Sequence, residues 1–113
     1  MSLVDKIRLA RQSQFEAGGF TFTISRPTDL DIATLGDKSM QQVAAKFVCG
    51  WNLKELDVIP GGTGSPAPFD SELFAEWLAD RPEFWMPLAE EILARYKQHV
   101  EGREENLVKP EAG

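Results

Sequence analysis

The sequence contains one cysteine, Cys49, and one histidine, His99, which form its only thiol–imidazole pair for nucleophilic catalysis. Such catalysis needs a reactive thiolate with a base within hydrogen-bond reach. Cys49 follows Phe47 and Val48 and precedes Trp51, so we expect a buried, structural thiol at a helix end. His99 is expected at the surface near a helix C-terminus, where a cation is favoured.

Two pairs of neighbouring carboxylates, Asp29 with Asp31 and Glu90 with Glu91, are the remaining candidates for acid–base or metal chemistry. Residues one or two positions apart do not share a helix face, so neither pair converges on one proton or ion. We expect Asp29 and Asp31 to stabilise the positive start of a helix. We expect Glu90 and Glu91 to face solvent, and the single Cys and single His exclude a multi-Cys/His zinc site.

Residues 60–68 contain three glycines and three prolines, and the Gly61–Gly64 part superficially resembles a phosphate-binding loop. A phosphate-binding P-loop continues with Gly-Lys-Ser/Thr, but no lysine occurs between Pro60 and Asp80. The composition also prevents a helix or a central strand from continuing through this segment. We predict a flexible surface loop within one domain. No enzyme activity, cofactor or metal is predicted for the chain.

The 113 residues include 12 basic and 18 acidic side chains, a formal net charge of −6. This balance disfavours nucleic-acid binding, because contacts to phosphates need a dense Lys/Arg surface. No apolar run approaches the roughly 20 residues that span a bilayer, and the first residues lack the apolar segment of a secretory signal. A cytoplasmic protein is therefore expected.

The charge is distributed unevenly along the chain. Residues 1–26 carry four basic and two acidic side chains, net +2, whereas residues 59–80 carry four acidic and no basic ones, net −4. One interpretation is an ordinary solvated surface. The other is head-to-tail pairing of a basic edge with an acidic edge of an identical subunit, which predicts weak, salt-sensitive self-association.

Residues 13–24 predict a β-hairpin around Gly18-Gly19, because a two-residue turn needs positive φ angles that glycine adopts without steric cost. This turn pairs Ala17 with Phe20, Phe15 with Phe22 and Ser13 with Ile24. The opposite face then carries the pairs Glu16–Thr21 and Gln14–Thr23. One face is apolar and the other polar, as expected for a half-buried antiparallel pair.

The rest of the chain predicts helices that begin at recognisable capping residues. Thr28 is expected to cap a helix over 29–35 that stops at Gly36. Ser39 and Gln42 form a capping box before an apolar face that includes Phe47 and Val48, and Gly50 ends that helix.

A third helix is expected after Asp70, with Phe69 and Phe74 as a hydrophobic staple and the apolar stripe continuing through Trp77. A fourth begins near Pro82, with Pro87 either kinking it or marking its start, and runs to Val100. The predicted fold class is α+β, mainly α: an N-terminal β-hairpin followed by about four helices. These form a single domain over 1–100, followed by a polar, flexible tail over 101–113.

The order of these segments resembles the tail assembly chaperones of long-tailed bacteriophages and prophages. The resemblance covers about residues 13–100 and rests on 20–29 (FTFTISRPTD), 47–51 (FVCGW), 68–73 (PFDSEL) and 77–82 (WLADRP). It implies a non-enzymatic helper in the bacterial host cytoplasm, absent from the mature virion. Such chaperones are thought to coat the tape measure protein and to bring tail-tube subunits to it, and family members often exist in two lengths through a ribosomal frameshift.

The three tryptophans and seven phenylalanines either fill the core or leave an apolar surface for a partner. For the partner surface we predict contributions from the last two helices, namely from Phe74, Trp77, Trp85 and Tyr96, laid against a helical segment of the tape measure protein or a neighbouring subunit. A minor virion protein such as a head–tail connector is an alternative. An acidic inhibitor that mimics DNA is another.

Overall fold

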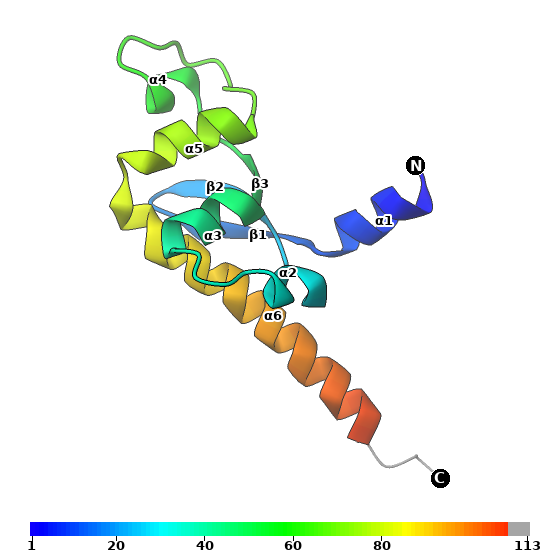
Figure 1. Cartoon of the computed structure of the whole chain (residues 1–113). Helices are drawn as coiled ribbons and strands as arrows, with labels where there is room; N and C mark the ends of the chain where they lie inside the picture. Colours follow the sequence, from blue (N-terminus) through cyan, green and yellow to red (C-terminus); the bar gives the residue numbers. More distant parts are fainter. Residues whose placement is uncertain (109–113) are drawn as a thin grey trace.

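The computed structural model describes residues 1–108 and places three strands and six α-helices in one domain of the α+β class (Figure 1). The prediction of about four helices omitted two elements: α1 (Leu3–Ala10), which precedes the hairpin, and the short α4 (Glu55–Val58). Within the described residues, no helix is both long enough and apolar enough to cross a membrane.

Strands β1 (Gln12–Ala17) and β2 (Phe20–Ser25) form the predicted hairpin, with the predicted register at every pair. Gly18 and Gly19 turn the chain with φ angles of 58° and 84°, which only glycine adopts without strain. Phe22 and Ile24 are fully buried on one face, while Gln14 lies exposed on the other and donates to Thr23 Oγ1. The hairpin therefore has the half-buried character expected from its alternating sequence.

A third strand, β3 (Val48–Trp51), pairs antiparallel with β2, so the prediction of a helix continuing to Gly50 was wrong. The helix before it, α3 (Met40–Phe47), ends one residue before Val48, although Val48 continues the apolar helical spacing. Val48 can serve either element, because it continues the apolar face of the helix and is also a β-branched residue of the kind that strands favour; it is buried in β3. Pairing with the free edge of β2 decides the outcome, since a two-stranded hairpin is marginal alone.

The predicted helix starts are present at each capping residue. Thr28 and Asp31 form a reciprocal capping box before α2 (Asp29–Ala33), and Ser39 and Gln42 form another before α3. Asp70 accepts a hydrogen bond from the backbone of Leu73 at the start of α5 (Ser71–Ala79). These side chains satisfy backbone N–H groups that have no partner within the helix.

A 3-10 turn, η1 (Pro82–Phe84), leads directly into the long helix α6 (Trp85–Val108). Pro87 lies in the first turn of α6, where a backbone N–H has no intrahelical acceptor, so the helix accommodates it. The helix continues beyond Val100 to Val108, so part of the segment predicted as a flexible tail is helical, and residues 109–113 lie outside the described residues.

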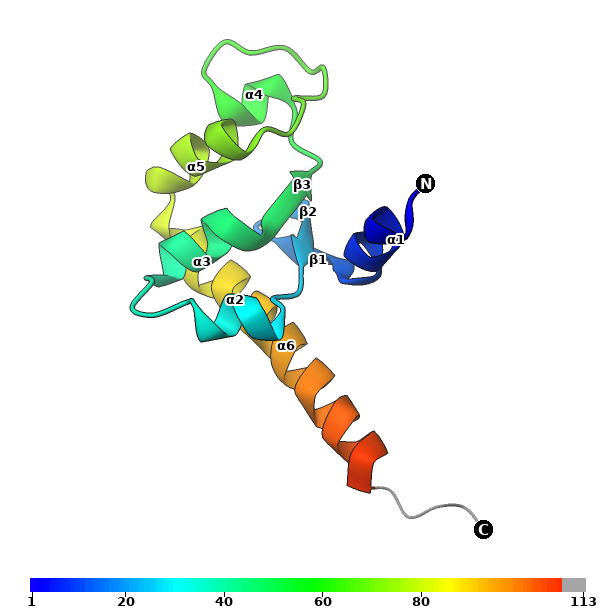
Figure 2. The same ribbon diagram turned by 45° about the vertical axis from the view of Figure 1, so that its right-hand side comes forward.

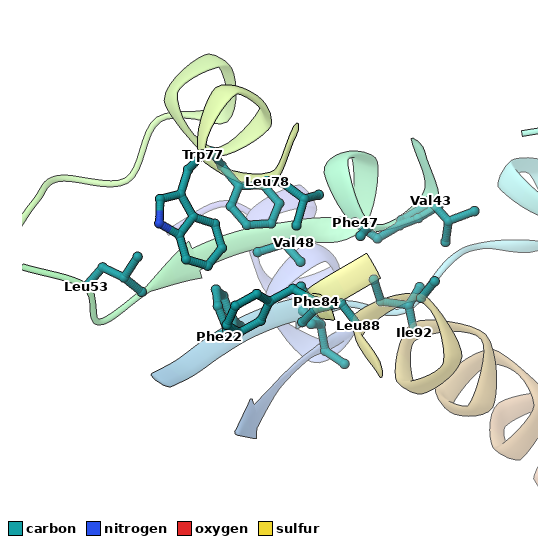
Figure 3. Close-up of a cluster of buried hydrophobic side chains, with 14 residues drawn as sticks. Phe22, Val43, Phe47, Val48, Leu53, Trp77, Leu78, Phe84, Leu88 and Ile92 are labelled. Atoms are coloured by element: carbon teal, nitrogen blue, oxygen red, sulfur yellow. The ribbon is translucent and has the colours of Figure 1, made fainter. Parts of the chain in front are cut away.

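The core lies between the apolar face of the sheet and the helices α3, α5 and the first half of α6 (Figures 1 and 3). Phe22 packs its ring 6.2 Å from Phe74 and 5.9 Å from Phe84, measured between ring centroids. Leu88 and Ile92 are completely buried beneath α3. The predicted staple is confirmed, since the rings of Phe69 and Phe74 lie 5.7 Å apart.

Candidate functional site

Cys49 is exposed on β3, so the prediction of a buried helix-end thiol was wrong. The pairing of β3 with β2 is irregular between Thr23 and Ile24, and Cys49 is the extra residue of the resulting bulge. Its Sγ lies 3.6 Å from the Thr23 carbonyl oxygen, and partial desolvation by the neighbouring chain raises the pKa of the thiol. A raised pKa favours the protonated thiol, which is the poorer nucleophile.

His99 lies half-buried within α6, well before its end at Val108, so its predicted position near a helix C-terminus was wrong. Glu90 is exposed on the same helix, and Glu91 forms an ion pair with Arg95. Among the described residues, no group of three or more His, Cys, Asp or Glu side chains is arranged to hold a metal ion.

The four residues predicted to contact a partner occupy two different environments. Phe74 and Trp77 lie in the core with exposures of 0% and 3%, so they contribute no outer surface. Trp85 is half-buried and its indole N–H donates to the Leu78 carbonyl at 2.7 Å. Tyr96 is half-buried farther along α6. The structure therefore does not bring these four side chains together into one apolar surface.

An apolar hollow lies instead between α4 and the start of α5, with a volume of about 290 Å³. A space of this size accommodates a few apolar side chains, at the lower limit of small-molecule pockets. Ile59 remains 57% exposed at this hollow, and neighbouring Leu56 is 53% exposed. We call this hollow the α4–α5 groove; it is lined by Glu55, Val58, Ile59, Gly62, Ala67, Pro68 and Leu73.

The Gly/Pro loop forms one wall of the groove and is joined to α4 by backbone hydrogen bonds. Glu55 donates its N–H to the Ser65 carbonyl at 2.9 Å, and Leu56 donates to the Thr63 carbonyl at 2.9 Å. The Glu55 carboxylate accepts from the Thr63 hydroxyl at 2.7 Å and from its N–H at 3.3 Å, which lowers the pKa of Glu55. Gly62 packs so closely on the Glu55 backbone that a Cβ would lie 2.5 Å away.

Two tryptophans fix the groove to the core. Trp51 donates its indole N–H to the Ala67 carbonyl at 2.8 Å, and Trp77 donates to the Asp57 carbonyl at 3.2 Å. The rings of these tryptophans lie 6.0 Å apart at a steep angle. The aromatic residues thus support the groove from below rather than lining it, and their indole groups satisfy carbonyls of the loop and of α4.

The segment that forms the groove is acidic. Residues 54–80 carry six acidic side chains and one basic side chain, net −5. The acidic side chains belong to α4, to α5 and to the two cap residues of α5, and they are Glu55, Asp57, Asp70, Glu72, Glu76 and Asp80. The groove therefore combines an apolar floor with a negative field.

Helix α1 projects from the body of the domain in both views (Figures 1 and 2). Its net charge is positive, whereas that of the segment forming the groove is negative. None of its residues is buried, and Leu3, Val4 and Ile7 are 75%, 54% and 56% exposed. Ile7 lies four residues after Leu3 and three after Val4, so its side chain neighbours both and the three form one contiguous apolar surface. Residues 1–11 carry three basic side chains and one acidic side chain, net +2.

Sequence reasoning missed α1 although its signals are present. Ser2 and Asp5 form a reciprocal capping box, the same device that correctly located α3 from Ser39 and Gln42. The apolar face at Leu3 and Ile7 has the helical spacing of four. What the sequence alone does not show is that this face has no cover within the described part of the chain.

Asp29 begins α2 and joins it to α6. Its carboxylate accepts from Tyr96 Oη at 2.8 Å and pairs with Arg103 Nη1 at 2.7 Å. The hydrogen bond from Arg103, and then that from Tyr96, lower the pKa of Asp29. Asp31 accepts from the Thr28 N–H, as expected for the first turn of a helix. Asp29 and Asp31 therefore have structural roles: the carboxylate of Asp29 binds side chains of α6, and that of Asp31 binds the cap residue Thr28.

Comparisons with protein-family models, with curated proteins and with solved structures found no match for this chain.

Proposed function

We propose that this protein is a tail assembly chaperone of a long-tailed phage or prophage, a non-enzymatic helper in the bacterial host cytoplasm. In this role it binds the tape measure protein, helps to recruit tail-tube subunits, and is absent from the mature virion. The observation that carries the proposal is the α4–α5 groove, an apolar hollow at the surface of a small acidic domain. The order of hairpin, capped helices and Gly/Pro loop is the order on which the resemblance rests.

The groove suits an apolar helical client. An amphipathic helix presents side chains at intervals of three and four residues, and a short groove receives one such group at a time. Ile59 and Leu73 supply aliphatic surface from opposite sides of the loop. A small contact of this kind gives weak, reversible binding at each site, and a long helical client offers many sites.

The client surface we propose differs from the four residues named from the sequence. Phe74 and Trp77 belong to the core beneath the groove. The indole N–H of Trp85 and the hydroxyl of Tyr96 donate hydrogen bonds to groups of the same domain. Leu73 on α5 and Ile59 after α4 replace them as contacts. The net negative charge keeps a protein with exposed aliphatic side chains in solution.

Coexpression with the tape measure protein encoded in the same tail gene cluster tests the proposal. The wild-type chain is expected to increase the soluble fraction of that protein and to co-purify with it. Ile59→Gln is expected to reduce both, because it places an amide in the apolar groove. Leu30→Gln is the matched control, since Leu30 is 73% exposed on α2, outside the groove.

No gain in solubility and no complex with the wild-type chain would overturn the proposal. If Ile59→Gln and Leu30→Gln reduced solubility and co-purification of the tape measure protein equally, the assignment of the groove as its binding site would be overturned. Mass spectrometry of purified particles separates the chaperone from a head–tail connector. The chaperone is absent from the particle, whereas a connector is present in fixed stoichiometry.

A further inference from the structure

We infer that α1 of one copy of this protein docks its apolar face into the α4–α5 groove of a second copy, so that the chain self-associates head to tail. In the absence of a client helix, the occupant of the groove is thus a basic amphipathic helix that each copy already carries, and α1 and a client helix compete for the same groove. This inference concerns the chain alone and does not depend on a role in tail assembly.

The first support is the complementarity of the two apolar surfaces. Leu3, Val4 and Ile7 form one contiguous apolar surface of α1, centred on Ile7, and are all more than half exposed. The groove offers aliphatic side chains, including Ile59 and Leu73, in a space of about 290 Å³. Both surfaces lose contact with water when they meet, which is the favourable term in such association.

The second support is the complementarity of charge. Lys6, Arg8 and Arg11 make the α1 segment basic, with Asp5 as its only acidic residue, net +2 over residues 1–11. The segment over residues 54–80, which contains α4, the Gly/Pro loop and α5, carries net −5. Opposite fields steer encounter and fix orientation, and they disfavour pairing of two grooves or of two α1 helices.

The third support is the placement of α1. It projects from the body of the domain in both views, and none of its residues lines the groove of its own copy (Figures 1 and 2). The donor and acceptor surfaces are different, so every copy that joins leaves one α1 and one groove unoccupied. Assembly by this contact therefore proceeds past the dimer.

The size of the contact sets its strength. A helix of eight residues is about 12 Å long, so it covers less than the roughly 1,600 Å² buried in a standard stable interface. The association is expected to be weak, concentration-dependent and sensitive to salt. Sedimentation velocity on the purified full chain, over a range of concentrations, measures it directly.

Three variants define the interface. Ile7→Gln removes an apolar contact from α1 and is expected to weaken association about tenfold, the effect of losing one buried aliphatic side chain. Ile59→Gln is expected to act similarly from the groove side. Leu9→Gln is the matched control, because Leu9 is 47% exposed on the other face of α1 and should leave association unchanged.

Mixing provides the decisive readout. The Ile7→Gln chain keeps an intact groove and the Ile59→Gln chain keeps an intact α1. At concentrations where each variant alone is monomeric, an equimolar mixture is expected to form a heterodimer that does not grow further. Raising the ionic strength from about 0.01 M to about 1 M shortens the Debye length from about 30 Å to about 3 Å and is expected to weaken the wild-type association several-fold.

The inference is overturned if the wild-type chain stays monomeric at every concentration, as it would if α1 covered its own groove. It is also overturned if Leu9→Gln weakens association as much as Ile7→Gln, or if the mixture of the two variants remains monomeric. If Ile7→Gln weakened self-association but Ile59→Gln did not, two α1 helices would pair with each other and the groove would be excluded as the docking site.

Discussion

Tyr96 donates a hydrogen bond from its Oη to Asp29 Oδ1 over 2.8 Å, joining residues 67 positions apart in the chain. Asp29 opens α2 and Tyr96 lies midway along α6, so this contact fixes a short helix against a long one. Arg103, farther along α6, donates to the other carboxylate oxygen at 2.7 Å. The contact places α2 at the end of the domain away from α4 (Figure 2).

The stability contributed by Asp29 is expected to depend on pH. Its pKa in the folded protein lies below the ordinary value of 3.8, so its contribution is fully present above 3.8. The contribution is lost as pH falls below that value and through the pKa of the folded state. Chemical unfolding should therefore show a difference between wild type and Asp29→Asn at neutral pH that shrinks in acid. Asp37→Asn, in the exposed loop before α3, serves as the control.

Gly18→Ala is expected to destabilise the domain by about 2–4 kcal/mol. The residue has φ 58°, and a Cβ would lie 2.6 Å from the ring of Phe84. Gly19→Ala is the matched control, because φ is 84° there but nothing lies within 4 Å of a Cβ. Gly19→Ala should lower the free energy of unfolding by about 1–2 kcal/mol, the cost of placing an alanine at a positive φ. Equal losses in thermal or chemical unfolding would show that the Phe84 contact is unimportant.

Gly62→Ala is expected to loosen the groove, because a Cβ would lie 2.5 Å from backbone atoms of Glu55. Backbone atoms cannot move aside as a flexible side chain can, so α4 and the loop must separate. Faster amide hydrogen exchange at Leu56, whose N–H bonds the Thr63 carbonyl, reports that separation. Gly64→Ala meets nothing within 4 Å and should leave exchange unchanged. Unaltered protection of Leu56 in Gly62→Ala would contradict the described packing.

Phe74→Ala is expected to cost about 3–5 kcal/mol, the range for a large aromatic side chain removed from a core. Phe74 is completely buried against Phe22 and Trp51. Met86→Ala is the control: Met86 is 49% exposed, and its loss should change the free energy of unfolding by about 0.5 kcal/mol or less. A small effect of Phe74→Ala would instead support the surface role predicted from the sequence.

Local signals predicted the elements whose geometry is set by neighbouring residues. The Gly18-Gly19 turn determined the hairpin register at every pair, since only that turn gives the observed alternation. Capping side chains at Thr28, Ser39 and Asp70 located three helix starts because each satisfies a backbone donor within four residues.

Contacts between distant segments decided the features that the sequence did not predict. Val48 continues a helical pattern, but pairing with β2 converts it to a strand, and the accompanying bulge exposes Cys49. The apolar stripe of α5 did not distinguish Phe74, in the core, from Leu73, in the groove. The groove itself arises from hydrogen bonds between α4 and a Gly/Pro loop that composition alone marks as irregular.

The measurement that tests the central claim most directly is co-purification of this chain with the tape measure protein after coexpression. The account predicts a complex with the wild-type chain and the Leu30→Gln control, together with more soluble tape measure protein. It predicts a marked loss of both with Ile59→Gln. A tape measure protein that remains insoluble and unbound in the presence of the folded wild-type chain would contradict the account.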